Sequence, residues 1–432
     1  MSLDFKEKAF EGITAEKPPS TRRLSTRLSH NVKAATGPTI EPALEPKLPT
    51  PPDGGLHAWL KVVGGFLIYI NIWGFTLTFG AFQTYYKHDF LSDSNASAIS
   101  WIGTVQAWLL ISVGVLTGPL FDLGYFRSML YLGNFLVVFG IMMLSLCKEY
   151  WQVFLAQGVC MGLGAGLLYI PSLALVGIWF QRKRALAMGF VMSGIAVGGI
   201  IYILMFDRLT KSTGFPWAIR AMGFIALFAA LLSFPALLSG SSILARPRKA
   251  RRLFDKTALK DKLFIIFTFS TFFTFLGYIV PYFYIPSYAQ DKLGTSGSTA
   301  LYSLVVSVAG SFFGRLGSGV LAHYLGSTVT WILCSLARFF SAGLVTLPSA
   351  AFANICPDLS LLGTRLGMSW GVSSIASLIG APIAGALIKT KNGHTDFIGV
   401  QVWSGTCLLL GTCWLFVLWV STVRVQKSGW WI

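Results

Sequence analysis

The stretch 151–176, WQVFLAQGVCMGLGAGLLYIPSLALV, contains no Asp, Glu, Lys or Arg. As an α-helix it is long enough to cross the hydrocarbon core of a bilayer, which is roughly 30 Å thick. Similar apolar runs recur from Trp59 almost to the C-terminus, and the chain is 54% hydrophobic and 12% charged, with a mean hydropathy of +0.65. Soluble domains usually carry about 25% charged residues. The sequence therefore predicts an all-α polytopic membrane protein with lipid as its main solvent.

The apolar runs predict two helical bundles. The first contains six spans, near residues 59–84, 99–120, 128–147, 151–176, 185–206 and 217–238. The second contains five, near residues 263–289, 298–322, 328–353, 366–388 and 398–423. With about eleven spans in total, the second bundle is one helix short of the first.

Polar segments between the runs predict the domain organisation. Residues 1–57 are rich in Pro, Ser, Thr, Lys and Arg, which is typical of a disordered tail. We expect the bundles to occupy 58–238 and 263–424, joined by a basic loop at 239–262 and followed by a short tail at 425–432.

The net charge of +17 does not require a nucleic-acid partner. Lys and Arg concentrate in the tail, at Arg127, at 182–184 and at 246–262, which are alternate gaps between the runs. Cytoplasmic segments of membrane proteins carry this excess. We therefore expect a multi-pass protein, placed in the plasma membrane, with a cytoplasmic N-terminus and central loop.

Asn95-Ala96-Ser97 is a glycosylation sequon in the first segment expected outside, so Asn95 is the candidate for glycosylation. The six cysteines lie in or beside apolar runs without metal-ligand spacing, which predicts free thiols and no metal site. No nucleotide-binding loop is present in the sequence, and we expect no cofactor.

An internal repeat locates the missing helix. GPLFD at 118–122 ends the second span, and GVLAH at 319–323 ends the eighth. Arg184 and Arg365 begin equivalent later spans, yet Asp122 and Arg184 are 62 positions apart whereas His323 and Arg365 are 42 apart. The difference corresponds to about one membrane-spanning helix of roughly 20 residues.

Arg338 lies in the middle of the run 328–353, where the missing helix would fall. An arginine at the centre of a span costs roughly 2.5–3.5 kcal/mol on insertion scales. Three interpretations fit: a functional cation, the join left by a missing exon or mis-predicted intron, or the turn between two half-helices. We favour the join, because the arginine and the deficit coincide. If the chain is taken as written, the C-terminus should emerge outside unless this region re-enters the membrane.

Two related halves and a loop from GPLFD to Arg127 resemble the major facilitator superfamily. Within it, the chain resembles the fungal monocarboxylate-transporter-like (monocarboxylate porter) family over about residues 50–424. The motifs that carry this resemblance, in order, are PDGG at 52–55, Trp59, Phe79-Gly80, Tyr85-Tyr86, SWIG at 100–103, EYW at 149–151, RALA at 184–187, Gly314-Arg315 and GTRLG at 363–367.

The resemblance implies facilitated or proton-coupled movement of small carboxylates, or export of metabolites by relatives with different pockets. Two features depart from the family. Animal members have a lysine within the first span, but 70–79 contains no charge here. They also pair an aspartate with an arginine one turn later in the eighth span, whereas Ser311 precedes Arg315 here. The proton-binding carboxylate that the family implies is therefore absent at that position.

Arg315 is the main candidate for substrate binding. It lies about two-thirds along an apolar span, so its side chain should face a cavity or a partner and not lipid. Its planar guanidinium can bind a carboxylate through two hydrogen bonds. A structural contact with helix-end carbonyls or a neighbouring helix is the alternative.

Asp122 and Arg127, in the short loop after the second span, are candidates for a latch that holds one helix end against its neighbours in the outward-facing state. Arg184, Arg365 and His323 are further gating candidates at the related positions. Because His323 replaces the acid in the second half, the latch there should be weaker or pH-dependent. Topology signalling alone is the alternative.

Polar and aromatic side chains inside apolar spans are candidates for a substrate-binding wall. They are Asn71, Tyr169, Tyr278, Tyr282, Trp370 and Ser373. Tyr278 and Tyr282 are one turn apart and therefore share a helix face. Each candidate could instead make a hydrogen bond between helices. Pro281 and Pro286 are expected to break the seventh span beside the two tyrosines.

We interpret the chain as a secondary active or facilitative transporter of small organic solutes, with a monocarboxylate or other organic anion as the expected substrate. A co-transported proton is compatible with the resemblance. Efflux of a bulkier secondary metabolite is the alternative, and a non-transporting sensor or defective splice product is an alternative of a different class. We expect no enzyme, because the spans contain no paired acids, Ser/His pair or His/Glu metal cluster at useful spacing.

Overall fold

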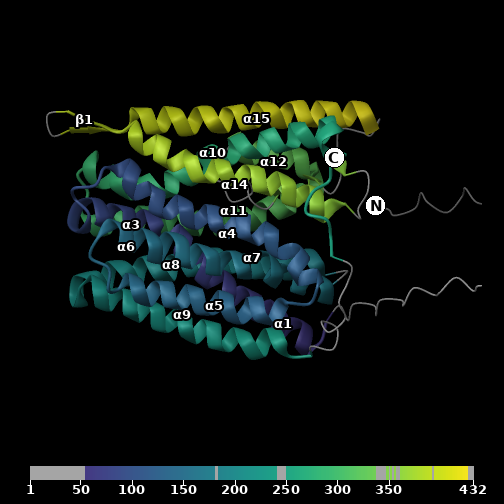
Figure 1. Cartoon of the computed structure of the whole chain (residues 1–432). Helices are drawn as coiled ribbons and strands as arrows, with labels where there is room; N and C mark the ends of the chain where they lie inside the picture. Colours follow the sequence, from purple (N-terminus) through teal and green to yellow (C-terminus); the bar gives the residue numbers. More distant parts are fainter. Residues whose placement is uncertain are drawn as a thin grey trace, which may run out of the picture. The chain divides into compact units, whose positions relative to one another are not determined.

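The computed structural model describes residues 54–180, 183–240, 250–336, 361–391 and 394–426, with the short pieces 347–349, 351–352 and 355–356. They all belong to one compact unit, Thr50–Ile432. Long helices lie side by side within this unit (Figure 1). Among the described residues, 10 helices are long and apolar enough to cross a membrane. The predicted all-α polytopic fold is therefore confirmed.

The first half of the chain contributes six of these spans. Its first span, Leu56–Phe90, changes its helical winding several times, and the fourth, Tyr150–Trp179, also contains a π-helical segment. The elements are α1 (Leu56–Tyr69), η1 (Ile70–Gly74), α2 (Phe75–Leu77), α3 (Phe79–Tyr85), η2 (Tyr86–Phe90), α4 (Ala96–Asp122), α5 (Phe126–Leu144), α6 (Tyr150–Val153), η3 (Phe154–Cys160), α7 (Met161–Trp179), α8 (Arg184–Thr213) and α9 (Phe215–Leu238).

The described residues of the second half form one short helical turn, five longer helices and a small antiparallel hairpin, which projects beyond the helices in Figure 1. The elements are η5 (Ala258–Lys260), α10 (Lys262–Asp291), α11 (Gly297–Leu325), α12 (Ser327–Leu336), α14 (Leu362–Ala386), β1 (Lys389–Lys391), β2 (His394–Asp396) and α15 (Ile398–Gln426). The predicted span 328–353 starts within α12, but residues 337–346 lie outside the described part of the chain. The three interpretations of Arg338 therefore stay predictions.

Local side chains and glycines set the helix ends. Asn95 accepts a hydrogen bond from the backbone N–H of Ala98 and caps α4, and Asp261 caps α10 in the same way. Gly214 links α8 to α9 with a φ of 79°, a conformation that residues with a Cβ rarely adopt. This tight link makes α8 and α9 antiparallel neighbours.

Proline does not interrupt the seventh span. α10 runs continuously through Pro281 and Pro286, so the predicted break is wrong. Membrane helices tolerate proline when neighbouring groups and small backbone adjustments satisfy the freed carbonyl. The irregular winding lies instead in the first half, where Ile70–Gly74 and Phe154–Cys160 form π-helical segments without a proline.

Glycines allow the second and fourth spans to approach closely. An added Cβ at Gly162 would lie 2.9 Å from the Cβ of Leu109, and one at Gly166 would lie 2.5 Å from the Cβ of Val113. Small residues at four-residue spacing favour this packing in membranes, because helix association there depends on close van der Waals contact.

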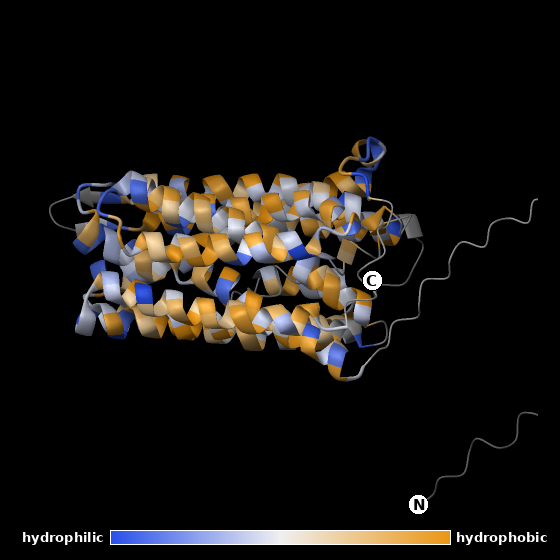
Figure 2. Ribbon diagram, turned by 60° about the horizontal axis from the view of Figure 1, so that its bottom comes forward, coloured by the Kyte–Doolittle hydropathy of each residue, from blue (hydrophilic) through white to orange (hydrophobic). Residues whose placement is uncertain are grey.

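Apolar residues dominate the middle of the helices, and hydrophilic residues gather toward their ends (Figure 2). We call the end that carries Asp122, Arg251 and Arg365 the basic end, and the end that carries Asn95 and Asp291 the sequon end. They are opposite ends, because α4 begins after Asn95 and finishes at Asp122. Contacts between α4 and α14, α8 and α11, and α3 and α10 join the two halves.

Candidate functional site

A cavity of about 710 Å³ lies between the two halves of the chain. Helices α4, α7 and α8 of the first half and α11 and α14 of the second contribute to its wall. The exposed residues Arg252 and Leu253 also line it, so the cavity reaches the basic end. Most lining residues are apolar, and the lining includes Tyr169, Met188, Gly189, Met192, Ser193, Arg252, Leu253, Arg315, Thr364 and Trp370.

Arg315 on α11 brings a positive charge to this wall. Its Nε and Nη1 atoms are buried and have no hydrogen-bond partner among the described residues. The guanidinium lies beside the phenol of Tyr278 on α10. A buried donor without a partner costs roughly 1–3 kcal/mol, and more when it is charged. Arg315 is therefore suited to donate hydrogen bonds to an anion in the cavity.

Two of the predicted aromatic residues also line the cavity, Tyr169 on α7 and Trp370 on α14. The ring of Trp73 packs edge-on against Tyr169 with ring centres 5.6 Å apart, and Phe275 packs against Trp370 at 5.2 Å. These contacts hold the wall residues in place. Each half of the chain thus presents an aromatic ring to the cavity.

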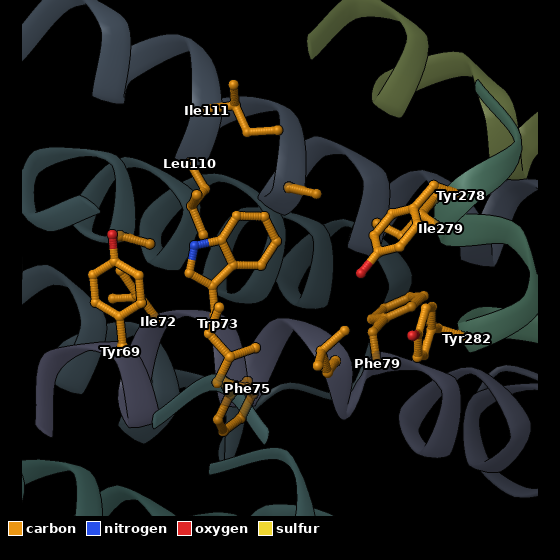
Figure 3. Close-up of a cluster of buried hydrophobic side chains, with 14 of the residues drawn as sticks. Tyr69, Ile72, Trp73, Phe75, Phe79, Leu110, Ile111, Tyr278, Ile279 and Tyr282 are labelled. Atoms are coloured by element: carbon orange, nitrogen blue, oxygen red, sulfur yellow. The ribbon is translucent and has the colours of Figure 1, made fainter. Parts of the chain in front are cut away.

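Tyr278 and Tyr282 lie one turn apart on α10 and face Phe79 of the first half (Figure 3). Their ring centres are 5.5 Å apart, and both side chains are buried. Neither residue is part of the wall described above. Tyr278 nevertheless contacts Arg315, so it can influence where the guanidinium lies.

Asn71 and Ser373 connect helices and do not line the cavity. Asn71 donates to the carbonyl oxygen of Ala226 at 2.9 Å and accepts from the hydroxyl of Tyr202 at 2.8 Å. Ser373 donates to Oγ1 of Thr271 at 3.0 Å. For these two residues, the structure shows the interhelix hydrogen bonds that were the alternative to substrate binding.

At the basic end, the segment 250–261 connects to both halves. Arg251 donates to both carboxylate oxygens of Asp122, from Nε at 2.6 Å and from Nη2 at 2.9 Å. On the other side, Thr364 of α14 donates to the backbone carbonyl of Arg252 at 2.7 Å. Asp122 thus pairs with the central segment, and no motif in the sequence singled out Arg251 as its partner.

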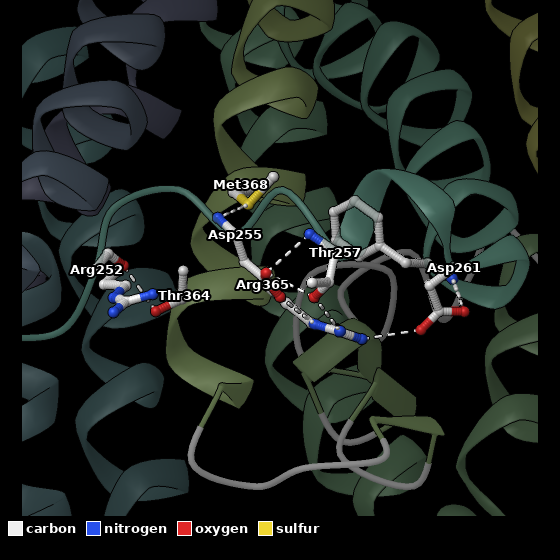
Figure 4. A network of polar contacts seen from close by, with 8 residues as sticks. Arg252, Asp255, Thr257, Asp261, Thr364, Arg365 and Met368 are labelled. Carbon is white, nitrogen blue, oxygen red and sulfur yellow. Dashed lines mark hydrogen bonds and ion pairs between the residues drawn. The ribbon is translucent and has the colours of Figure 1, made fainter.

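Arg365 ties the same segment to α14 (Figure 4). Its guanidinium pairs with Asp255 and Asp261 at 2.9 Å each and donates to the hydroxyl of Thr257 at 3.1 Å. Hydrogen bonds from Thr257 and Arg365 hold the pKa of Asp255 below its usual value. Because the side chain of Arg365 is 7% exposed, salt screens its ion pairs less than it would screen pairs on the surface.

The remaining gating candidates have less structural definition. Arg127 lies in the first turn of α5. The side chains of Arg184 and His323 lie outside the described part of the chain, so a pH-dependent latch at His323 stays a prediction. Asn95 is exposed, and its side chain caps α4; its glycosylation also stays a prediction.

Direct contacts between the halves close the sequon end. Thr84 of α3 and Ser287 of α10 share a hydrogen bond at 3.0 Å. The backbones also approach closely, since an added Cβ at Gly80 would lie 2.1 Å from the carbonyl oxygen of Tyr282. The backbones of α3 and α10 are therefore in direct contact at this level, with no room for a side chain between them.

Charged and hydroxyl groups strengthen this closure. Lys87 Nζ pairs with Asp291 Oδ2, and His88 Nε2 lies 3.2 Å from Asp291 Oδ1. Ser100 of α4 shares a hydrogen bond with the hydroxyl of Tyr284 on α10. In the described part of the chain, the cavity thus opens toward the basic end and is closed toward the sequon end.

Two helical halves around a central cavity, with one end open and the other closed, are the architecture of carriers that work by alternating access. The chain belongs to the Major Facilitator Superfamily, whose model matches residues 62–351. It is therefore a multi-pass membrane transporter, as the superfamily resemblance predicted.

Individual relatives and a solved structure are similar to most of the chain. The chain is 36% identical over 404 residues to the MFS-type transporter dbaD of Emericella nidulans, covering 86% of this chain and 90% of the relative. It is 36% identical to the aspyridones efflux protein apdF of the same species, covering 90% and 82% of the two chains. The solved peptide transporter POT in complex with sulfate has a TM-score of 0.64 at 12% identity, covering 88% of this chain and 97% of that one. Neither relative is named as a monocarboxylate transporter, so that closer resemblance stays a prediction.

Proposed function

We propose that the protein exports a bulky organic acid. The observation that carries this proposal is Arg315, which lines a 710 Å³ cavity with two buried guanidinium N–H groups that have no partner among the described residues. A cation at this depth is costly unless it is paired, and a carboxylate can pair with it through two hydrogen bonds. Substrate binding would thus satisfy two N–H groups that have no partner among the described residues.

Cavity size favours a bulky substrate over a small monocarboxylate. Sites for drug-sized ligands have volumes of roughly 300–1,000 Å³, and 710 Å³ lies within this range. The efflux relative covers most of this chain at 36% identity. We therefore place efflux of a larger metabolite ahead of monocarboxylate transport, with Tyr169 and Trp370 contacting its apolar body.

Alternating access would require the two ends to open in turn. In this proposal, the contacts of Asp122 and Arg365 with the segment 250–261 rearrange when the basic end closes, while the sequon-end contacts break. Arg127, Arg184 and His323 complete the proposed gating set. Asn71, Tyr278, Tyr282 and Ser373 act indirectly, because they hold helices and neighbouring side chains and do not line the cavity.

The basic end is proposed to face the cytoplasm, in agreement with the excess of Lys and Arg there. The conformation described would then be open to the inside, ready to load a metabolite for export through the plasma membrane. The N-terminus would be cytoplasmic, and Asn95 would face outward for glycosylation. A co-transported proton would have to bind elsewhere, because the described cavity wall contains no Asp or Glu.

Arg315→Gln tests the proposal in proteoliposomes that contain the purified protein, with fluorescein as a bulky aromatic acid and protein-free vesicles as the blank. Hydrogen bonds to charged groups contribute about 1.5–3 kcal/mol, so we expect the half-saturating concentration to rise about tenfold or more. Arg315→Lys should recover part of the loss, because it keeps the charge without the planar fork.

Arg424→Gln is the matched control, because Arg424 is exposed in the last turn of α15 and lies outside the cavity wall. It should transport fluorescein as the unmodified protein does. If Arg315→Gln inserts normally and transports fluorescein with unchanged kinetics, the acid-binding role of Arg315 is wrong. If the unmodified protein moves no organic acid at all, the non-transporting alternatives gain support.

A further inference from the structure

Gly189 on α8 is a wall residue without a packing reason to be glycine. An added Cβ at this position would meet no atom within 4 Å, and the residue lines the cavity. Gly194 and Gly198 on the same helix differ, because a Cβ there would lie 2.5 Å from the carbonyl oxygen of Phe66 and 2.4 Å from that of Ile70. The space beside Gly189 therefore belongs to the cavity and not to a helix contact.

Glycine in this position carries an energetic cost. In a helix interior it is about 1 kcal/mol less favourable than alanine. Gly189 is helical and is absent from the positive-φ glycines of the described chain, so the backbone does not require it either. An alanine or a larger residue at this position would reduce the volume of the cavity.

Gly189 lies on the path between Arg315 and the cavity mouth. α8 and α11 run antiparallel and pack at Gly199 and Val308, where an added Cβ would lie 3.0 Å from Val308 Cγ1. From this level toward the basic end, a rise of 1.5 Å per residue places Gly189 about 15 Å away and Arg315 about 10 Å away. The backbone of Gly189 is thus about one helical turn nearer the mouth than the backbone of Arg315.

Flexible side chains border this space. Met188, Met192 and Ser193 line the cavity beside Gly189 on α8. Methionine adapts to irregular shapes because its side chain is unbranched and polarizable. The wall at this level can therefore accept apolar bodies of different outline, provided that the volume beside Gly189 stays free.

We infer that Gly189 sets the upper size limit of the substrate. This inference rests on the proposed function. With the carboxylate of the substrate on Arg315, its apolar body extends toward the mouth and occupies the space that the missing side chain leaves. The residue would determine which acids fit and would have no part in holding the acidic group.

A series of Gly189→Ala, Gly189→Val and Gly189→Leu in proteoliposomes tests the inference with two acids, fluorescein and the much smaller benzoate. Fluorescein transport should fall stepwise with side-chain size, by about tenfold or more at leucine, which is the discrimination that steric contacts in apolar pockets reach. Benzoate transport should stay within about twofold of the unmodified protein across the series, because one aromatic ring leaves room for the added side chain.

Gly310→Leu on α11 is the matched control. An added Cβ at Gly310 also meets nothing within 4 Å, but Gly310 does not line the described cavity. It should transport both acids normally. Size-exclusion profiles and thermal unfolding of each variant separate a folding defect from a transport defect, and Gly189→Val carries the test if Gly189→Leu does not fold.

The outcomes separate the two proposals. Equal transport of fluorescein by the unmodified protein and by folded Gly189→Val or Gly189→Leu would overturn the size-limit role and leave the proposed function intact. An equal loss of both acids would also overturn it, because the residue would then affect transport in general. If the unmodified protein transports neither acid, the proposed function fails and this inference fails with it.

Discussion

Lys61 shows how a charged residue can be structural in a membrane span. It lies in α1 with its side chain fully buried, and its Nζ donates to the carbonyl oxygens of Ala236 at 3.2 Å and Leu237 at 2.7 Å, at the end of α9. A cation at a helix C-terminus satisfies carbonyls that have no partner within the helix. Lys61 lies outside the stretch 70–79, which corresponds to the lysine position of the animal family members, and it caps a neighbouring helix and does not line the cavity.

Lys61→Met should therefore destabilise the protein without a direct effect on substrate binding. Leaving buried carbonyls without donors costs roughly 1–3 kcal/mol, and the melting temperature in detergent should fall accordingly. Tryptophan fluorescence during heating would measure this change. Lys292→Met is the control, because Lys292 is exposed beyond α10, and it should melt as the unmodified protein does. Equal melting of the two variants would contradict the capping role.

At the level of elements, the segment 250–261 is a strap between the two halves. One side of it is held by Asp122 of α4, and the other by Arg365 and Thr364 of α14. Arg252 and Leu253 of the strap line the cavity near the basic end. A change in the distance between α4 and α14 would therefore alter the contacts of the strap. Under the proposed function, we expect this to couple the strap to the opening and closing of the basic end.

Asp122→Asn should weaken the strap on the α4 side and slow fluorescein exchange in proteoliposomes. The pair is partly exposed, at 12% for Asp122 and 35% for Arg251, so we expect an effect of about 1 kcal/mol, or about fivefold in rate. Arg251→Gln should have the same effect.

Exchanging the two charges, with Asp122→Arg and Arg251→Asp in one protein, should restore part of the lost rate. A double-mutant cycle measures this coupling directly. Additive losses without any recovery would show that the ion pair does not control exchange, and Asp122 would then act through another contact.

Across the whole molecule, one conformation combines an open basic end with a closed sequon end. The closure joins residues more than 200 positions apart, such as Thr84 with Ser287 and Lys87 with Asp291. These contacts are incompatible with a path through the sequon end. Transport to that side therefore requires the two halves to move apart there, most simply as rigid bodies.

A disulfide across this closure should stop transport reversibly. The side-chain oxygens of Thr84 and Ser287 are 3.0 Å apart, so Thr84→Cys with Ser287→Cys places two thiols within bonding reach. Oxidation should abolish fluorescein exchange, and dithiothreitol should restore it. Each single cysteine variant is a control and should be insensitive to oxidation. Full exchange through the oxidised double variant, with the bond verified by mass spectrometry, would exclude opening at this point.

Hydropathy and charge alone determined the fold class, because they reflect a local property, the preference of each segment for lipid or water. The recurring apolar runs, such as 151–176, predicted the membrane helices. The two related halves, with the loop from GPLFD at 118–122 to Arg127, predicted the superfamily. Hydropathy also suggested cavity candidates, namely the polar and aromatic residues within apolar spans. Of these, Tyr169, Arg315 and Trp370 line the cavity. Hydropathy could not separate these from Asn71 and Ser373, because it does not say which face of a helix meets a neighbour.

Only the tertiary structure decided which groups meet. Asp122 pairs with Arg251 and Lys61 caps α9, and these partners are separated by more than 120 positions in the sequence. The open space beside Gly189 likewise exists only because helices from both halves leave it unfilled. The physical reason is that a bilayer selects each helix by its own composition, whereas ion pairs, caps and cavities depend on the packing of several helices at once.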